Sequence, residues 1–151
     1  RIWLDAIPVI KKIKVPPSLA EGLGVDIVAY YKTNNKHIVL IESEAALKNM
    51  QPNFQELRKL ETFGYSVTAK GDHVDFVSRT IVPHVQQLED AATGSSHAAL
   101  VPFWAERLGK EKLQARQLSK RGGAFYCEIA NDQVMLEGQY KILAEGKLNL
   151  G

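Results

Sequence analysis

Two carboxylates and a run of small hydroxyl residues lie close together in the second half of the sequence. Glu89 and Asp90 are followed after two alanines by the segment 93–96, which reads T-G-S-S and precedes an apolar run. A helix that begins here leaves about four backbone N–H groups unpaired and carries about half a positive charge at its start. Such a helix start binds anions, and a neighbouring carboxylate can be held protonated or exchange a proton.

The same residue types also have purely structural roles. An aspartate before a helix is typical of a helix cap, and Ser95 can be an N-terminal hydroxyl, so both alternatives stay open for Asp90 and Ser95. His97 has the sequence position of a packed or exposed first-turn histidine. A Ser95–His97 nucleophilic pair is disfavoured, because the sequence has no G-x-S-x-G elbow and residues two apart on a helix point in different directions.

The helix that would carry this site differs from an ordinary surface helix. The pattern predicts a helix over 94–108 that ends at Gly109, with no charged residue between His97 and Ala105. Apolar side chains cover most of its circumference, so we expect it to be buried nearly all round, with a sheet curled about it. Pro102 removes one hydrogen bond and predicts a kink near Ala98 rather than a break.

Strand patterns dominate the rest of the chain, and no β-α-β alternation is evident. Alternation in 124–130 places Phe125, Cys127 and Ile129 on one face, which is typical of an antiparallel sheet covering a core. The predicted class is therefore α+β with a mainly antiparallel sheet. Strands are predicted at 2–7, 26–32, 37–42, 65–70, 73–80, 113–119, 124–130, 133–137 and 139–145; a short helix at 18–23, two more within 43–61, and a connector over 8–17.

Length and composition set the remaining bounds. A chain of 151 residues supports about one domain, its net charge is only +2 with scattered basic residues, and no apolar run is long enough to cross a membrane. Nucleic acid and membrane are therefore not expected as partners. The single cysteine, Cys127, cannot form an intrachain disulfide, which favours a cytoplasmic location. The start at Arg1, without an initiator Met, leads us to expect a piece of a longer protein.

Three segments resemble one known family, the PhzF-like isomerases of phenazine biosynthesis, which share the diaminopimelate-epimerase fold. Segment 75–79 (D-F-V-S-R), followed by Pro83, is similar to the family's D-F-x-S-R-x-x-x-P, and segment 89–97 (E-D-A-A-T-G-S-S-H) is similar to E-D-P-x-T-G-S-A-H. Segment 117–123 (Q-L-S-K-R-G-G) resembles Q-x-S-x-R-G-G. The order and spacing of the motifs both match, and the resemblance covers roughly residues 37–150.

The resemblance implies two lobes, each with a sheet wrapped as a barrel around a central helix, and an active site in the cleft between them. Residues 1–151 would be the second, C-terminal lobe, with the N-terminal lobe absent. The implied reaction is proton transfer on a small carboxylate-bearing metabolite, with no cofactor and no metal. Asp90 and Ser95 take the catalytic roles, the partner lobe supplies a glutamate and a histidine, and a homodimer is implied.

For substrate binding, the resemblance and the helix start together predict a cradle for the substrate carboxylate. Arg79 could reach that carboxylate, although a strand arginine is also typical of a structural ion pair. The predicted substrate-binding residues are Thr93, Gly94, Ser95, Ser96 and Arg79. Two other functions stay open: a catalytically silent ligand-binding or protein-interaction module of the same fold, and a phosphate binder that uses the same helix start.

Overall fold

The computed structural model describes residues 1–86, 88–90 and 94–138, and of Asp90 it describes the backbone. The strand predicted at 139–145 lies outside these residues. The helices are α1 (Pro17–Leu23), α2 (Glu44–Asn49), α3 (Phe54–Leu57) and α4 (Gly94–Leu108). The strands are β1 (Ile2–Asp5), β2 (Val9–Ile13), β3 (Ala29–Thr33), β4 (His37–Leu40), β5 (Tyr65–Lys70), β6 (Phe76–Val82), β7 (Leu88–Asp90), β8 (Lys112–Gln117), β9 (Gly123–Ala130) and β10 (Gln133–Gly138).

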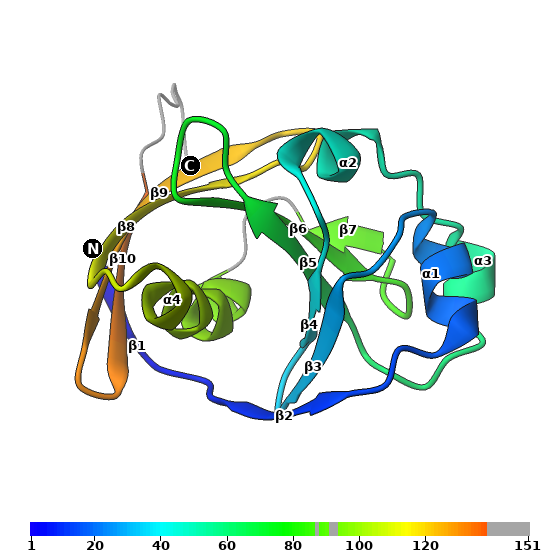
Figure 1. The fold of residues 1–151 in the computed structure, drawn as a ribbon, viewed down its shortest axis with the longest axis horizontal. Coiled ribbons are helices and arrows are strands. Elements are labelled where there is room, and N and C mark those ends of the chain that lie inside the picture. The colour runs from blue at the N-terminus through cyan, green and yellow to red at the C-terminus, as the bar shows by residue number, and fades with distance from the viewer. Residues whose placement is uncertain (87, 91–93, 139–151) are drawn as a thin grey trace.

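These strands form one sheet that curls around α4 (Figure 1). Its order is β1-β10-β9-β8-β6-β5-β4-β3-β2, with β7 attached to β6 as a branch. The expected barrel closure is wrong, because the two end strands β1 and β2 do not pair with each other. They follow one another along one extended path, and the three residues between them make no turn that would place β1 beside β2.

The sheet contains both antiparallel and parallel strand pairs. Most neighbouring strands are antiparallel, which confirms the predicted class, but β4 pairs parallel with β5 and β6 pairs parallel with β8. The first parallel pair is connected through α2 and α3, and the second through β7 and α4. Each of these connections contains a helix, because parallel neighbours need a crossover, although no β-α-β alternation runs along the sequence.

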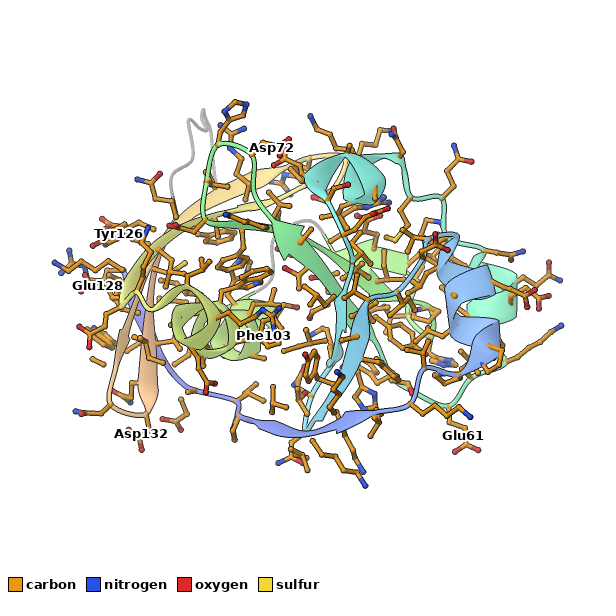
Figure 2. All side chains as sticks on the ribbon, viewed as in Figure 1. Glu61, Asp72, Phe103, Tyr126, Glu128 and Asp132 are labelled. Atoms are coloured by element: carbon orange, nitrogen blue, oxygen red, sulfur yellow. The ribbon has the colours of Figure 1, made fainter. Side chains whose placement is uncertain are left out.

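Helix α4 has the bounds and the burial that its sequence predicts. Nine of its residues are buried, and Trp104 stacks on Phe76 with ring centroids 5.9 Å apart while its indole N–H donates to Thr68 Oγ1 at 3.0 Å. Phe103 projects from the helix toward the sheet (Figure 2), where its ring lies 5.1 Å from that of Tyr31. Gly109 ends the helix with φ 65, a left-handed conformation that suits glycine.

The helix runs through Pro102 without a break, because another segment replaces the missing hydrogen bond. A proline at position 102 cannot donate to the carbonyl of Ala98 four residues earlier. The backbone N–H of Ile7 donates to that carbonyl instead, at 2.9 Å. The segment between β1 and β2 is thereby joined directly to the middle of the central helix.

A second core, which the sequence pattern does not reveal, lies on the outer face of the sheet. Helices α1, α2 and α3 cover this face, and Figure 1 shows them outside the curl that holds α4. Strands β3, β4 and β6 contribute side chains to both cores, whereas the apolar side chains of β5 belong to the outer one. Fully buried side chains in this outer core include Leu19, Leu23, Leu47, Leu57, Val67 and Ile81.

Strand β2 was expected to be part of a connector, and that expectation is wrong. Among the described strands it pairs only with β3, at the edge of the sheet, with a register irregularity between Val9 and Lys11. Four of its five residues are exposed, so neither face carries the alternation that marks a half-buried strand. Only the pairing with β3 distinguishes this segment from a loop.

The single cysteine, Cys127, is buried in the core around α4. Burial raises the pKa of the Cys127 thiol to about 12, with the charge of Asp75 as a smaller cause, so the thiol stays protonated and unreactive near neutral pH. In the part of the chain that the structure describes, no helix has the length and apolar character needed to span a bilayer.

Candidate active site at the start of the central helix

The start of α4 and strand β7 place the predicted site residues near one another. Ser95 is exposed in the first turn of α4, whereas Ser96 beside it is buried. Strand β7 pairs with β6 so that Asp90 lies opposite Thr80. Thr93, predicted to bind substrate, lies outside the described residues. The backbone of Asp90 is thus brought beside the strand that contacts the first helical turn.

A buried polar network joins the three sequence motifs beneath this turn. The hydroxyls of Thr80 and Ser96 lie 3.0 Å apart, and the side-chain amide of Gln117 donates to Thr80 Oγ1 at 3.3 Å. All three side chains are at most 1% exposed. Each comes from a different segment: β6, the start of α4 and the end of β8. The network therefore fixes the start of α4 against the sheet.

Substituting Thr80 by valine should lower the free energy of unfolding by about 1–3 kcal/mol, because it leaves the buried polar groups of Ser96 and Gln117 short of a partner. Urea denaturation of the variant measures this loss. Ser66, which pairs with Thr80 in the register, is the matched control, since its buried hydroxyl has no partner within the described residues. Ser66→Ala should leave stability unchanged or slightly higher, and an equal loss in both variants would contradict the prediction.

Lys36 is a site residue that sequence reasoning missed. It lies at the end of the turn between β3 and β4, its side chain is buried with 6% exposure, and its ammonium donates to Ser95 Oγ at 2.8 Å. In the sequence it belongs to T-N-N-K, an ordinary polar turn. No local signal distinguishes it from an exposed turn lysine, because its partner lies 59 residues away.

The structure holds Lys36 in place from three sides. Asn35 Oδ1 accepts from both the backbone N–H and the ammonium of Lys36, at 3.0 and 2.9 Å, and Thr33 Oγ1 donates to its carbonyl at 2.8 Å. Gly64 provides room for its aliphatic part, since a Cβ at this position would lie 3.2 Å from Lys36 Cγ and 2.9 Å from Val82 Cγ1. The ammonium therefore reaches Ser95 from a fixed turn.

Arg79 is engaged in structural contacts. Its guanidinium makes a bidentate pair with Glu89, at 2.8 and 2.7 Å, and donates to the backbone carbonyls of Leu47 and Met50 at 2.9 and 2.7 Å. These contacts tie β6 to β7 on one side and to the end of α2 on the other. They favour the structural ion-pair role for Arg79 over substrate binding, and they stabilise the strand that carries Asp90.

The histidines near the site are packed in the interior to different degrees. His97 is fully buried, with its ring centroid 4.4 Å from that of Phe125 and 5.9 Å from that of Phe76, which favours the packed role. His37 follows Lys36 on the chain, and its Nδ1 lies 2.8 Å from the hydroxyl of Tyr30. Burial lowers the pKa of His37, with the charge of Lys32 as a second cause, and burial raises the pKa of Tyr30 to about 12.

Two hollows of the structure lie at the other end of α4. One cavity of about 580 Å³ is lined by residues that include Asp75, Lys110 and Tyr126, and a second of about 420 Å³ by residues that include Trp104 and Arg107. Neither includes Ser95 or Lys36. Within residues 1–86, 88–90 and 94–138, no group of three or more His, Cys, Asp or Glu side chains is arranged to hold a metal ion.

Comparison with known proteins gives consistent matches. The family model described as phenazine biosynthesis-like protein matches residues 11–146, so the similarity begins well before the roughly 37–150 seen from the motifs. An uncharacterized isomerase of Pseudomonas aeruginosa is 39% identical over 132 residues, which are 87% of this chain and 51% of that protein. The chain thus spans about half the length of the curated relatives that it matches.

Two solved structures have the same fold. A phenazine biosynthesis protein of the PhzF family from Enterococcus faecalis is 34% identical with a TM-score of 0.81, covering 90% of this chain and 54% of that one. A putative PhzC/PhzF protein from Clostridium difficile is 36% identical with a TM-score of 0.79, covering 92% of this chain and 55% of that one.

Proposed function

Because the chain belongs to the phenazine biosynthesis-like (PhzF) family, we propose that it forms one lobe of an isomerase that moves a proton on a small carboxylate-bearing metabolite. Relatives in the family are named isomerases, without a stated substrate. The observation that carries the proposal is the exposed Ser95 in the first turn of a buried helix, with a lysine ammonium 2.8 Å from its hydroxyl. Positive charge and hydrogen-bond donors converge there, as a carboxylate requires.

In this proposal the reaction exchanges one C–H bond for another. A carboxylate takes the proton from one carbon of the substrate, the bonding electrons stay on the substrate, and a proton returns to a second carbon or to the other face. Atoms and electrons balance without an oxidant or a reductant. Asp90 orients the substrate or assists this relay, and backbone amides of 93–96 with the Ser95 hydroxyl hold the substrate carboxylate.

The site needs a second wall, because Ser95 lies on an exposed surface of this lobe. The relatives are about twice as long as the chain, so a partner lobe in the same protein is the proposed source of that wall and of a second proton-transferring carboxylate. A cleft between the two lobes would exclude water from the bound substrate, which strengthens each electrostatic contact in it. Pairing of two such proteins into a homodimer is part of the same proposal.

The function is tested by solvent-deuterium entry in the longer gene product. Small carboxylic acids with an activated C–H bond are incubated in deuterated buffer, and deuterium at carbon is followed by NMR. We expect exchange with the unaltered protein and a loss of about 100-fold with Ser95→Ala, the size seen when one donor to a developing charge is removed. If carboxylates bind without any exchange, the protein is a ligand-binding module instead. Heat protection by phosphate alone would indicate a phosphate binder.

A further inference from the structure

Two large apolar side chains are exposed on either side of the start of α4. Ile2 and Phe63 are each 51% exposed, whereas the cores around α4 and beneath the outer helices bury most of the apolar side chains that the structure describes. Ile2 belongs to β1, and Phe63 lies in the loop that leads into β5. Figure 1 shows β1 and β5 on opposite sides of α4. The polar first turn of this helix therefore has an exposed apolar side chain on each side.

Ile2 is held close to the first residue of α4. It lies opposite Leu136 in the register between β1 and β10. A Cβ built at Gly94 would lie 4.0 Å from Ile2 Cδ1 and 3.7 Å from Leu4 Cδ1, which are ordinary van der Waals contacts. Ile2 therefore borders the helix start directly, beside the residue that precedes the exposed Ser95.

The loop that carries Phe63 is fixed by contacts with the segment that follows β6. Arg58 Nε donates to the carbonyl of Pro83 at 3.0 Å. The neighbouring His84 donates from Nε2 to the carbonyl of Leu60 at 2.8 Å. Phe63 is thus exposed on a backbone that is held in place from two sides, so its position is set before any partner binds.

Gly64, which follows Phe63, connects this loop to the candidate site. The carbonyl of Gly64 accepts from the backbone N–H of His37 at 3.0 Å. A Cβ at Gly64 would lie 3.2 Å from Lys36 Cγ, and Lys36 donates to Ser95 Oγ at 2.8 Å. Phe63 and Ser95 are therefore linked through neighbouring residues at one end of the lobe.

The surface formed by Ile2, Ser95 and Phe63 combines two apolar side chains on fixed backbone with a polar centre. Such a combination is typical of a surface that another part of a protein covers, and aromatic side chains are enriched there. The chain covers 51% and 52% of two of its relatives, so about half of a protein of that length lies outside it. That other half fits this surface better than a second copy does, because a linked segment is present at a high effective concentration.

We propose that Ile2 and Phe63 are the apolar anchors by which the other half of the longer protein docks on this lobe, one on each side of Ser95. This inference rests on the two-lobe arrangement of the proposed function, though not on proton transfer. Burial of the two apolar side chains holds the halves together. The polar first turn of α4 lies between the anchors and is left for a ligand.

The test measures thiol labelling in the longer gene product, with labelled peptides identified by mass spectrometry. Ile2→Cys and Phe63→Cys report the two anchors, and Val28→Cys is the matched control, since Val28 is 59% exposed and lines a hollow at the other end of α4. Cys127 adds little background, because burial raises its pKa to about 12. Relative to its own rate in urea, each anchor variant should react about tenfold or more slowly than Val28→Cys. If either anchor variant reacts as fast as Val28→Cys, the inference is overturned.

Dilution identifies what covers the anchors. Docking within one chain gives labelling rates that stay the same when the protein is diluted about 100-fold. Cover by a second copy gives rates that rise on dilution, and that result overturns the inference.

A second set of variants tests whether the anchors share one interface. Adding Phe63→Asp to Ile2→Cys should raise the labelling rate about fivefold, whereas Phe63→Leu or Val28→Asp should leave it unchanged. An unchanged rate with Phe63→Asp contradicts the shared interface, and the rates of the single-cysteine variants decide the case where Phe63→Asp does not fold. Slow labelling without deuterium entry would remove the isomerase function and leave the docking surface standing.

Discussion

Replacing Arg79 by methionine should lower the free energy of unfolding by about 3–5 kcal/mol, a large share of the roughly 5–15 kcal/mol typical of a domain. The substitution leaves the Glu89 carboxylate, 19% exposed at its side chain, without its bidentate partner. It also removes the donor to the carbonyls of Leu47 and Met50 at the end of α2. Urea denaturation followed by circular dichroism measures the change.

Two further variants give the Arg79 prediction its control. Lys59→Met breaks an exposed ion pair with Glu56 at 3.0 Å and should cost less than about 1 kcal/mol. Adding Glu89→Leu to Arg79→Met should recover part of the loss, since no buried charge is then left unpaired, but not all of it, because the two carbonyls stay without a donor. If Arg79→Met cost no more than Lys59→Met, the structural role of Arg79 would be refuted.

Substituting Asp90 by asparagine should reduce solvent-deuterium entry about 100-fold or more, the typical contribution of a positioned acid or base. Asparagine caps a helix about as well as aspartate, so the variant keeps a capping function while it loses the charge and the ability to accept and return a proton. The experiment therefore separates the two roles that the sequence leaves open for Asp90. Rates of deuterium entry at saturating substrate, with urea denaturation alongside, provide the measurement.

Asp132→Asn is the matched control for Asp90→Asn. Asp132 lies at the tip of the β9–β10 hairpin, which Figure 2 shows at the rim of the molecule, and its removal should leave the exchange rate unchanged. If Asp90→Asn leaves the rate of deuterium entry unchanged, Asp90 acts as a helix cap. The catalytic proposal for this residue would then fall, although carboxylate binding at Ser95 could stand.

Elements that carry their own local signal could be predicted from the sequence. The bounds of α4 follow from its hydroxyl start, its uncharged centre and Gly109, and β5 matches the predicted 65–70 because its flanking glycines mark both ends. The shared face of Phe125, Cys127 and Ile129 is confirmed by their common contact with the core around α4. In each case a periodic pattern of at least six residues lies between clear stop signals.

Features that depend on distant partners could not be predicted. Strand β2 is identified only by its pairing with β3, and the open sheet only by the path of the chain between β1 and β2. The same holds within the site: Ser95 and Asp90 belong to a motif that can be read locally, whereas Lys36 contacts Ser95 across the fold. Arg79 shows the limit most clearly, since its two carbonyl partners belong to backbone that no side-chain pattern can reveal.

The hydrogen bond from Ile7 to Ala98 has a consequence for how the fold assembles. Because Pro102 leaves one carbonyl of α4 without an internal partner, the helix is completed only when a segment from the far end of the described chain docks against it. Secondary structure and long-range topology then form together, which favours a cooperative transition with high contact order over stepwise addition of a preformed helix. The hydrogen bonding of α4 is therefore complete only when the segment between β1 and β2 has reached its native position beside the helix.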